Sequence, residues 1–192
     1  MPMSAQASNL NEELGQVEYV FSDKTGTLTC NIMEFKKFSA GYQAYGTGEK
    51  PKKKQEENVN FYDKNLEYDL LNNQRPNHEA LVRVVLFLAA CHTIVIDEKK
   101  GTYTSSSPDE LALVNAAKQF GYEFQGRDPD DAMVILNRNS GRTMKYQLLN
   151  ICEFTSTRKR MSCIFRDPQG RLVLMCKGAD TVISERLSSQ SR

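Results

Sequence analysis

The chain has 192 residues, of which 40% are hydrophobic, and its 25 Lys and Arg nearly balance 24 Asp and Glu, leaving a net charge of +1. This length allows one large hydrophobic core or two small ones, and the composition fits a soluble globular protein rather than a disordered one. Because the charges balance, no overall field favours nucleic acid or an anionic membrane surface. Partners therefore have to be inferred from local features.

Neither a signal peptide nor a membrane span is predicted. Residues 1–8 lack an apolar stretch, and the most hydrophobic window, residues 81–96, contains Arg83 and His92. That window is shorter than the roughly 20 apolar residues of a spanning helix, so we expect a buried helix there, with any membrane-embedded part outside this chain. The cysteines lack CxxC spacing and are predicted to be reduced thiols, mostly in the core: Cys30, Cys91, Cys152, Cys163 and Cys176.

A phosphate-accepting turn is predicted after the first apolar segment. Residues 17–22 are β-branched and aromatic and predict a buried strand, with Asp23 directly at its end. Gly26 allows the backbone to close around a phosphate, and a carboxylate fixed there can attack a phosphoryl group. The alternative is an ordinary strand-to-loop turn in which Asp23 bonds its own backbone.

A change of composition follows this region. Residues 32–39 predict a second extended segment, whereas residues 41–60 contain three glycines and a lysine-rich run at 50–57. Such a segment cannot bury a core, so we expect a mobile loop at about 46–60. Contact of its lysines with anionic lipid headgroups is the less favoured alternative, because glutamates adjoin them.

Two helices are predicted in the middle of the chain. The first spans residues 77–93, with Asn77 as N-cap and Glu79 in the first turn. The second begins where Ser107 can cap, Pro108 suits the first position and Glu110 completes a capping box, and it should end at Gly121.

His78 and His92 are the only histidines. They lie too far apart for a helical metal pair, so we interpret both as structural residues and expect no zinc site.

The C-terminal third predicts an antiparallel sheet. Strands are expected at residues 132–137, 143–154, 162–166 and 171–176, with a hairpin turn at 167–170 between the last two. Hairpin-connected strands preceded by helices indicate an α+β fold, a mainly antiparallel sheet flanked by helices. The strand before Asp23 is expected to belong to a separate parallel sheet, because ligands commonly sit at the carboxyl ends of parallel strands.

Several sequence strings together resemble the lipid-flipping P4 subfamily of P-type ATPases. They are SNLNEELGQV at 8–17, DKTGTLTCN at 23–31, SSPDE at 106–110, EFTSTRKRMS at 153–162 and KGAD at 177–180. The resemblance runs from about residue 8 to 187. It implies that residues 1–37 are one piece of a HAD-like α/β phosphorylation domain and that residues 38–192 form a nucleotide-binding domain. We find no actuator DGET loop and no GDGxND motif.

The resemblance also implies the chemistry of the DKTGTLT turn. Asp23 would become an aspartyl phosphate, Lys24 would neutralise phosphate charge, and Asp23 with the Thr25 main chain would bind Mg²⁺. Thr25 stands where phosphatases of similar fold carry a second Asp as general acid and base, and it has no such capacity. The phosphoenzyme should therefore persist until another domain supplies a hydrolytic group.

An ATP site is implied without a GxxxxGK[ST] phosphate loop, which the chain lacks. By the resemblance Phe154 would stack on adenine, Glu110 would lie near the base, and Ser156, Lys159 and Lys177 would line the pocket. From the residues alone, Phe154 could be an inward strand residue, Glu110 only a capping residue and Lys177 a solvated turn residue.

A nucleic-acid surface at residues 158–160 is disfavoured, because three basic residues are a narrow footprint in a chain of balanced charge. We expect no nucleic-acid partner.

The sequence thus predicts the ATP-binding and phosphorylation-loop segment of an ATP-driven phospholipid translocase. Its partners would be the transmembrane and actuator domains of the pump, the phospholipid and an accessory membrane subunit, at the cytosolic face of a membrane. The chain alone should bind ATP weakly and not complete the cycle. The alternatives are a stand-alone nucleotide-binding fragment and a segment of a cation-transporting P-type ATPase, which FTSTRKRMS disfavours.

Overall fold

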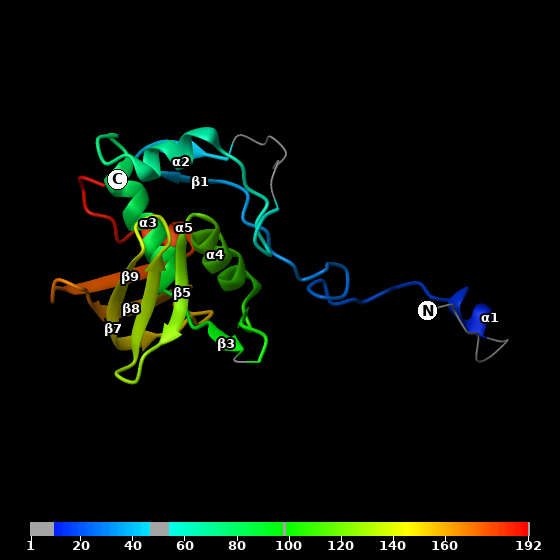
Figure 1. The fold of residues 1–192 in the computed structure, drawn as a ribbon. Coiled ribbons are helices and arrows are strands. Elements are labelled where there is room, and N and C mark those ends of the chain that lie inside the picture. Colours follow the sequence, from blue (N-terminus) through cyan, green and yellow to red (C-terminus); the bar gives the residue numbers. More distant parts are fainter. Residues whose placement is uncertain (1–9, 47–53, 98, 192) are drawn as a thin grey trace. The chain divides into compact units, whose positions relative to one another are not determined.

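The chain forms two compact units that divide after Ile32 (Figure 1). The structure is a computed structural model, and it describes residues 10–46, 54–97 and 99–191. The second unit begins at Met33, ahead of the expected boundary at residue 38, because Phe35 already packs in its core. The Phe35 ring lies 5.8 Å from Phe61 and 5.7 Å from Phe38.

The first unit contains the short helix α1 (Leu10–Leu14) but not the strand predicted at residues 17–22. Tyr19, Val20 and Phe21 are 77%, 83% and 95% exposed. That prediction is wrong for this structure, because a strand exists only with a hydrogen-bonded neighbour and no described segment provides one. The turn that follows does form: the Leu28 and Thr29 amides donate to the Lys24 carbonyl at 3.0 and 3.1 Å, and Gly26 has φ +81°.

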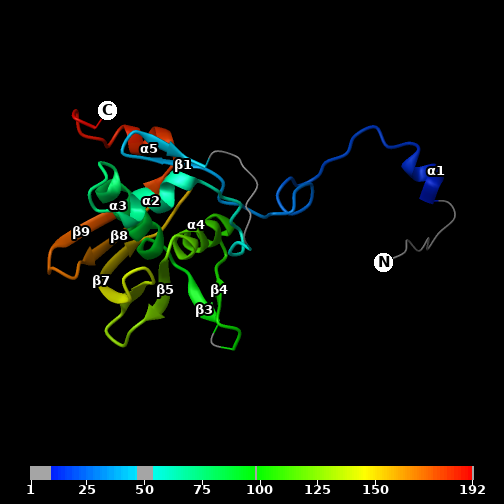
Figure 2. The ribbon, with the colours of Figure 1, turned by 45° about the horizontal axis from the view of Figure 1, so that its top comes forward.

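The second unit is built on a five-stranded antiparallel sheet whose strands follow one another in sequence order (Figures 1 and 2). The expected α+β class is confirmed. The four predicted strands are all present with small shifts at their ends, and the first strand of the sheet was not predicted. The strands are β5 (Tyr122–Arg127), β6 (Ala132–Asn137), β7 (Arg142–Cys152), β8 (Arg160–Arg166) and β9 (Leu172–Gly178).

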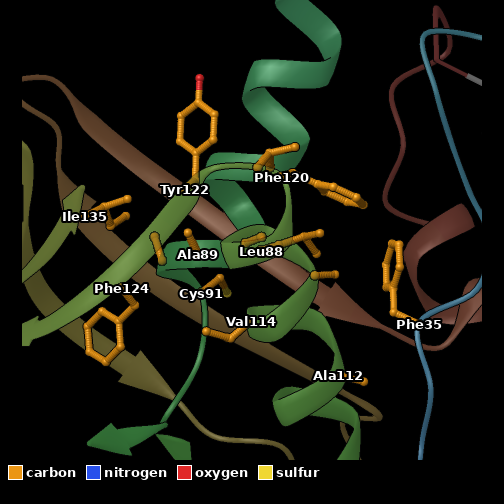
Figure 3. Close-up of a cluster of buried hydrophobic side chains, with 14 of the residues drawn as sticks. Phe35, Leu88, Ala89, Cys91, Ala112, Val114, Phe120, Tyr122, Phe124 and Ile135 are labelled. Atoms are coloured by element: carbon orange, nitrogen blue, oxygen red, sulfur yellow. The ribbon is translucent and has the colours of Figure 1, made fainter. Parts of the chain in front are cut away.

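Helices α3 (His78–Ala90) and α4 (Pro108–Gln119) pack against each other and against β5, which places the main core on one face of the sheet. Figure 3 shows side chains of both helices meeting those of β5 and β6 there, including Ala89, Val114, Phe124 and Ile135. All five cysteines are free thiols, but Cys30 is exposed and only Cys91 and Cys163 are buried, so the expectation that most of them lie in the core is wrong.

The starts of these helices agree with the predicted caps only in part. Ser107 does accept the Glu110 amide at 3.4 Å, and α4 ends before Gly121 as expected. The Glu110 carboxylate, however, bonds elsewhere and does not complete the capping box. Asn77 occupies the N-cap of α3, but its side chain accepts no capping bond. Its Nδ2 group instead donates to the Ala40 carbonyl at 2.9 Å and to the Tyr45 hydroxyl at 2.6 Å, which turns the side chain towards the hairpin that contains both residues.

A smaller layer covers the start of α3. It consists of the hairpin β1 (Phe38–Ala40) and β2 (Gln43–Tyr45) with helix α2 (Lys64–Leu71). The extended segment predicted at 32–39 overlaps only the start of β1, and β2 and α2 were not predicted. The mobile loop expected at 46–60 is partly corrected: residues 47–53 lie outside the described residues, but Val59 is buried and pairs with Phe35. This pairing gives the polar segment an apolar anchor.

The remaining elements are the hairpin β3 (Val95–Asp97) and β4 (Thr102–Thr104), which was not predicted either, and the short helix α5 (Asp180–Ser184). Helix α3 ends at Ala90, earlier than the predicted residue 93.

Among the described residues, none of the helices has the length and apolar character needed to cross a bilayer.

A buried carboxylate holds the smaller layer together. Asp69 is 1% exposed and accepts Arg75 Nε at 2.7 Å and the Tyr45 hydroxyl at 3.0 Å. Burial alone would raise the pKa of Asp69, but the bonds from Arg75 and Tyr45 outweigh it and hold the pKa below its usual range. The stability that this group contributes is therefore present above its unfolded-state pKa and is lost as the pH falls.

We predict that Asp69→Asn lowers the free energy of unfolding by about 2–3 kcal/mol, because it removes charge-assisted bonds from a buried site. Glu79→Gln is the control, since Glu79 and its partner Arg83 are each 77% exposed, and its effect should stay within about 0.5 kcal/mol. Urea unfolding of both variants measures the difference. Equal effects would contradict the role given to Asp69.

Candidate functional site

A cavity of about 710 Å³ opens between the start of α4 and the ends of β7, β8 and β9. It collects side chains from segments far apart in the sequence. Three residues predicted to form a site, Glu110, Phe154 and Lys177, line it together. The lining residues are Thr93, Ser106, Ser107, Asp109, Glu110, Leu113, Glu153, Phe154, Met161, Lys177, Gly178 and Ala179.

A largely buried ion pair lies at the wall of this cavity. Lys177 Nζ lies 2.8 Å from Glu110 Oε1, while Glu110 Oε2 accepts the Thr93 amide at 3.0 Å and the Thr93 hydroxyl at 2.8 Å. Burial alone would raise the pKa of Glu110, but Lys177 and Thr93 outweigh it and keep the pKa below its usual range. The site therefore presents a fixed carboxylate and a fixed ammonium group.

His92 supports this network from the core, as the structural interpretation of that residue implied. Its Nδ1 accepts the Ile94 amide at 3.1 Å, and its Nε2 lies 2.9 Å from the Ala89 carbonyl. The first contact requires an unprotonated Nδ1, so the ring is neutral with its proton on Nε2. Burial lowers the pKa of His92 to about 4.

The loop between β7 and β8 is held from inside by Arg158. Its Nη1 donates to the carbonyls of Cys152, at 3.0 Å, and of Arg160, at 3.2 Å, and also bonds the Glu153 carbonyl. Phe154 stands on this loop and is 62% exposed. The expectation that Phe154 could be an inward strand residue is thus not met, since β7 ends at Cys152.

Gly178 brings β9 close to the same loop. A Cβ on this residue would lie 2.5 Å from the Lys159 carbonyl oxygen, and the Ala179 amide donates to that same oxygen at 3.0 Å. Lys159 has φ +49°, a left-handed conformation that the tight loop imposes. Its side chain and that of Ser156 are exposed, and neither residue lines the cavity.

The remaining predicted site residues, Asp23, Lys24 and Thr25, belong to the first unit and are exposed. Within the described residues, no hydrogen bond or ion pair engages the Asp23 carboxylate. Nor do three His, Cys, Asp or Glu side chains gather into a metal-binding group anywhere in the described ranges.

A second hollow, of about 580 Å³, lies between α2 and the end of α4. Its cations are already paired, since Arg138 lies 2.7 Å from Glu123 and Lys118 lies 3.3 Å from Glu56. This second hollow contains none of the predicted site residues. The candidate site is therefore the cavity at the start of α4, referred to below as the cavity beside α4.

Comparison with known proteins identifies the family. Residues 79–192, more than half of the chain, match the family described as P-type ATPase, cytoplasmic domain N. The chain belongs to the P-type ATPases. The resemblance to the lipid-flipping subfamily is confirmed by relatives that match nearly the whole chain.

Three relatives illustrate this similarity. Phospholipid-transporting ATPase DRS2 of Saccharomyces cerevisiae is 45% identical over 99% of the chain. Phospholipid-transporting ATPase FetA of Mus musculus is 43% identical and phospholipid-transporting ATPase IC of Homo sapiens 42% identical, each over 97% of the chain. The chain spans only 14%, 17% and 16% of the lengths of these three relatives.

Sequence analysis missed three contributors to this P-type ATPase site. Thr93 lies outside every quoted motif, and Gly178, although it is part of KGAD, was assigned no role there. Each contacts a residue far away in the sequence. Arg158 was considered only as part of a basic patch, whereas its guanidinium group bonds main-chain carbonyls.

We predict that Gly178→Ala displaces the loop at 153–160, because the added Cβ would collide with a main-chain oxygen. The matched control is Gly170→Ala at the other end of the β8–β9 hairpin, where φ is +79° but the space is open. That control should cost about 1 kcal/mol of backbone strain and leave the loop amides unshifted. NMR amide shifts and urea unfolding distinguish the two, and an unshifted loop in Gly178→Ala would refute the close approach.

The buried His92 ring predicts an acid-sensitive fold. A folded-state pKa of about 4, against 6.5 for a free histidine, means that the unfolded chain binds a proton that the folded chain excludes. The contribution of His92 to the free energy of unfolding should therefore be fully present above about pH 6.5. It should fall by about 3 kcal/mol as the pH drops towards 4. NMR titration of the ring tests this, with His78 in the same spectrum for comparison. A His92 midpoint near 6.5 would contradict it.

Proposed function

We propose that this chain binds ATP in the cavity beside α4 and accepts a phosphoryl group on Asp23, as part of a P-type ATPase that transports phospholipid. The observation that carries the proposal is the exposed Phe154 ring on a rigid loop, at the wall of a cavity that also contains a fixed Glu110–Lys177 pair. Such an aromatic face is a platform for a nucleobase.

Several side chains in and near the cavity are assigned a role in binding the nucleotide. Phe154 stacks on adenine, and Glu110 lies near the base, where its carboxylate can accept a hydrogen bond from the amino group of the adenine. Lys177 contributes a positive charge close to the nucleotide. Ser156 and Lys159, which are exposed on the loop that carries Phe154, are assigned to the pocket by the family resemblance, and their side chains must turn towards the nucleotide when it binds.

The chemistry of the first unit is phosphoryl transfer. The Asp23 carboxylate attacks the γ-phosphorus of ATP, the bond from that phosphorus to the β–γ bridging oxygen breaks, and ADP leaves with the electron pair. Lys24 neutralises charge on the phosphate, and the Lys24–Thr29 turn holds these groups on one tight loop. A carboxylate and a main-chain carbonyl are the hard oxygen donors that Mg²⁺ takes, so the Asp23 side chain and the Thr25 carbonyl would hold the ion. When bound, Mg²⁺ supplies charge neutralisation between phosphate and carboxylate.

The proposal extends to the protein of which this chain is a part. Because the relatives are named phospholipid-transporting ATPases, phospholipid is the proposed substrate of the pump. The partners are its transmembrane and actuator domains and an accessory membrane subunit, and the segment works at the cytosolic face of the membrane. Thr25 cannot act as an acid or base, so another domain must complete hydrolysis of the phosphoenzyme.

A calorimetric titration of the purified chain with ATP tests the binding site. We expect weak binding, with a dissociation constant near ~1 mM, or about −4 kcal/mol. Phe154→Ala should weaken it about tenfold or more, because a stacked base is worth about 1–3 kcal/mol. Lys177→Gln should do the same by removing the charge.

Leu174→Ala is the control for these variants, because Leu174 is a similarly exposed apolar residue, 66% exposed, on β9 and outside the cavity. It should bind ATP as the wild type does. Absence of binding by the folded wild type, or equal losses in Leu174→Ala and Phe154→Ala, would refute the proposed site.

A further inference from the structure

We propose that Thr93 is a positioning residue for the nucleotide site, acting through Glu110. The inference rests on the proposed function of the cavity and adds a residue that no sequence motif marks. Thr93 follows α3 and lies at the wall of the cavity, whereas Glu110 is in the first turn of α4. The Thr93 side chain, which follows α3, thus sets the orientation of the Glu110 carboxylate on α4.

The hydrogen bonds around the Glu110 carboxylate are divided between its two oxygens. Oε2 takes both Thr93 donors, the hydroxyl at 2.8 Å and the amide at 3.0 Å, and Oε1 takes Lys177 at 2.8 Å. A carboxylate offers about four lone-pair sites, so three are filled and one on Oε1 remains for a ligand. Without the hydroxyl, Oε2 keeps only the Thr93 amide, so the carboxylate can rotate about that single bond and its orientation towards Lys177 is less fixed.

The backbone that carries Thr93 is fixed from the core side. The neighbouring His92 is 1% exposed, and its ring bonds the Ile94 amide on one side and the Ala89 carbonyl on the other. The Thr93 amide is therefore held in one direction while its side chain faces the cavity. This rigidity allows a single hydroxyl to set the place of Glu110 and, through it, of Lys177.

Matched variants of Thr93 test the inference by ATP titration of the whole chain. Thr93→Val keeps the side-chain shape but removes the hydroxyl, and it should weaken ATP binding about tenfold. Thr93→Ser restores the hydroxyl and should bind within about twofold of wild type. In a Glu110→Gln background, Thr93→Val should add little further loss, because the residue acts through that carboxylate.

Three outcomes would overturn the inference. Unchanged binding in Thr93→Val would remove any role for the hydroxyl. Equal losses in Thr93→Val and Thr93→Ser would trace the effect to something other than the hydroxyl. A loss that persists in full in the Glu110→Gln background would show that Thr93 touches the nucleotide itself.

A second readout needs no nucleotide and separates this inference from the proposed function. The carboxyl carbon of Glu110, followed by NMR against pH, should titrate at a higher pH in Thr93→Val than in wild type, and Thr93→Ser should match wild type. In the wild type Lys177 is the charged partner in contact with Glu110, and the titratable groups His92 and Cys163 also interact electrostatically with this carboxylate. If wild type binds no ATP, the proposed function fails, while the Glu110 titration still supports or refutes the Thr93 contact.

Discussion

The cavity depends on one interaction, the 2.8 Å ion pair between Glu110 and Lys177. It joins the first turn of α4 to the end of β9, elements separated by 67 positions in the sequence. A carboxylate as buried as Glu110 is costly without partners, so Lys177 and Thr93 are what allow a charge to remain there. The same bonds that satisfy it also leave an oriented acceptor at the wall of the cavity.

The two units differ in the interactions that stabilise them. The unit from Met33 to Arg192 has its own apolar core and a complete five-stranded antiparallel sheet. The first unit exposes Tyr19, Val20 and Phe21, because no described segment covers them. In this P-type ATPase the chemistry proposed for Asp23 therefore rests on a turn of local hydrogen bonds, whereas the nucleotide cavity rests on long-range packing.

Much of the sheet could be predicted from the sequence, because alternation and turn residues act locally. The strands from β6 to β9 and the capping by Ser107 followed from such signals. The partner of Glu110 and the contact of Asn77 with Ala40 depend on long-range packing, so capping motifs misassigned both side chains. Helix α2 and two short hairpins were missed because their segments are too short for a clear period. The prediction of a strand at 17–22 was wrong because a run of β-branched and aromatic residues does not by itself provide the neighbouring strand that a sheet requires.

Mapping ATP onto the isotopically labelled chain by NMR amide shifts tests the central claim most directly, because the described residues line two cavities of similar size that ATP could enter. The account predicts that shifts gather at the walls of the larger one, at Thr93, Ser107, Glu110, Phe154, Met161 and Lys177. Shifts confined to the hollow beside α2, at Phe61, Asp63, Leu66, Lys118 and Arg138, would contradict it.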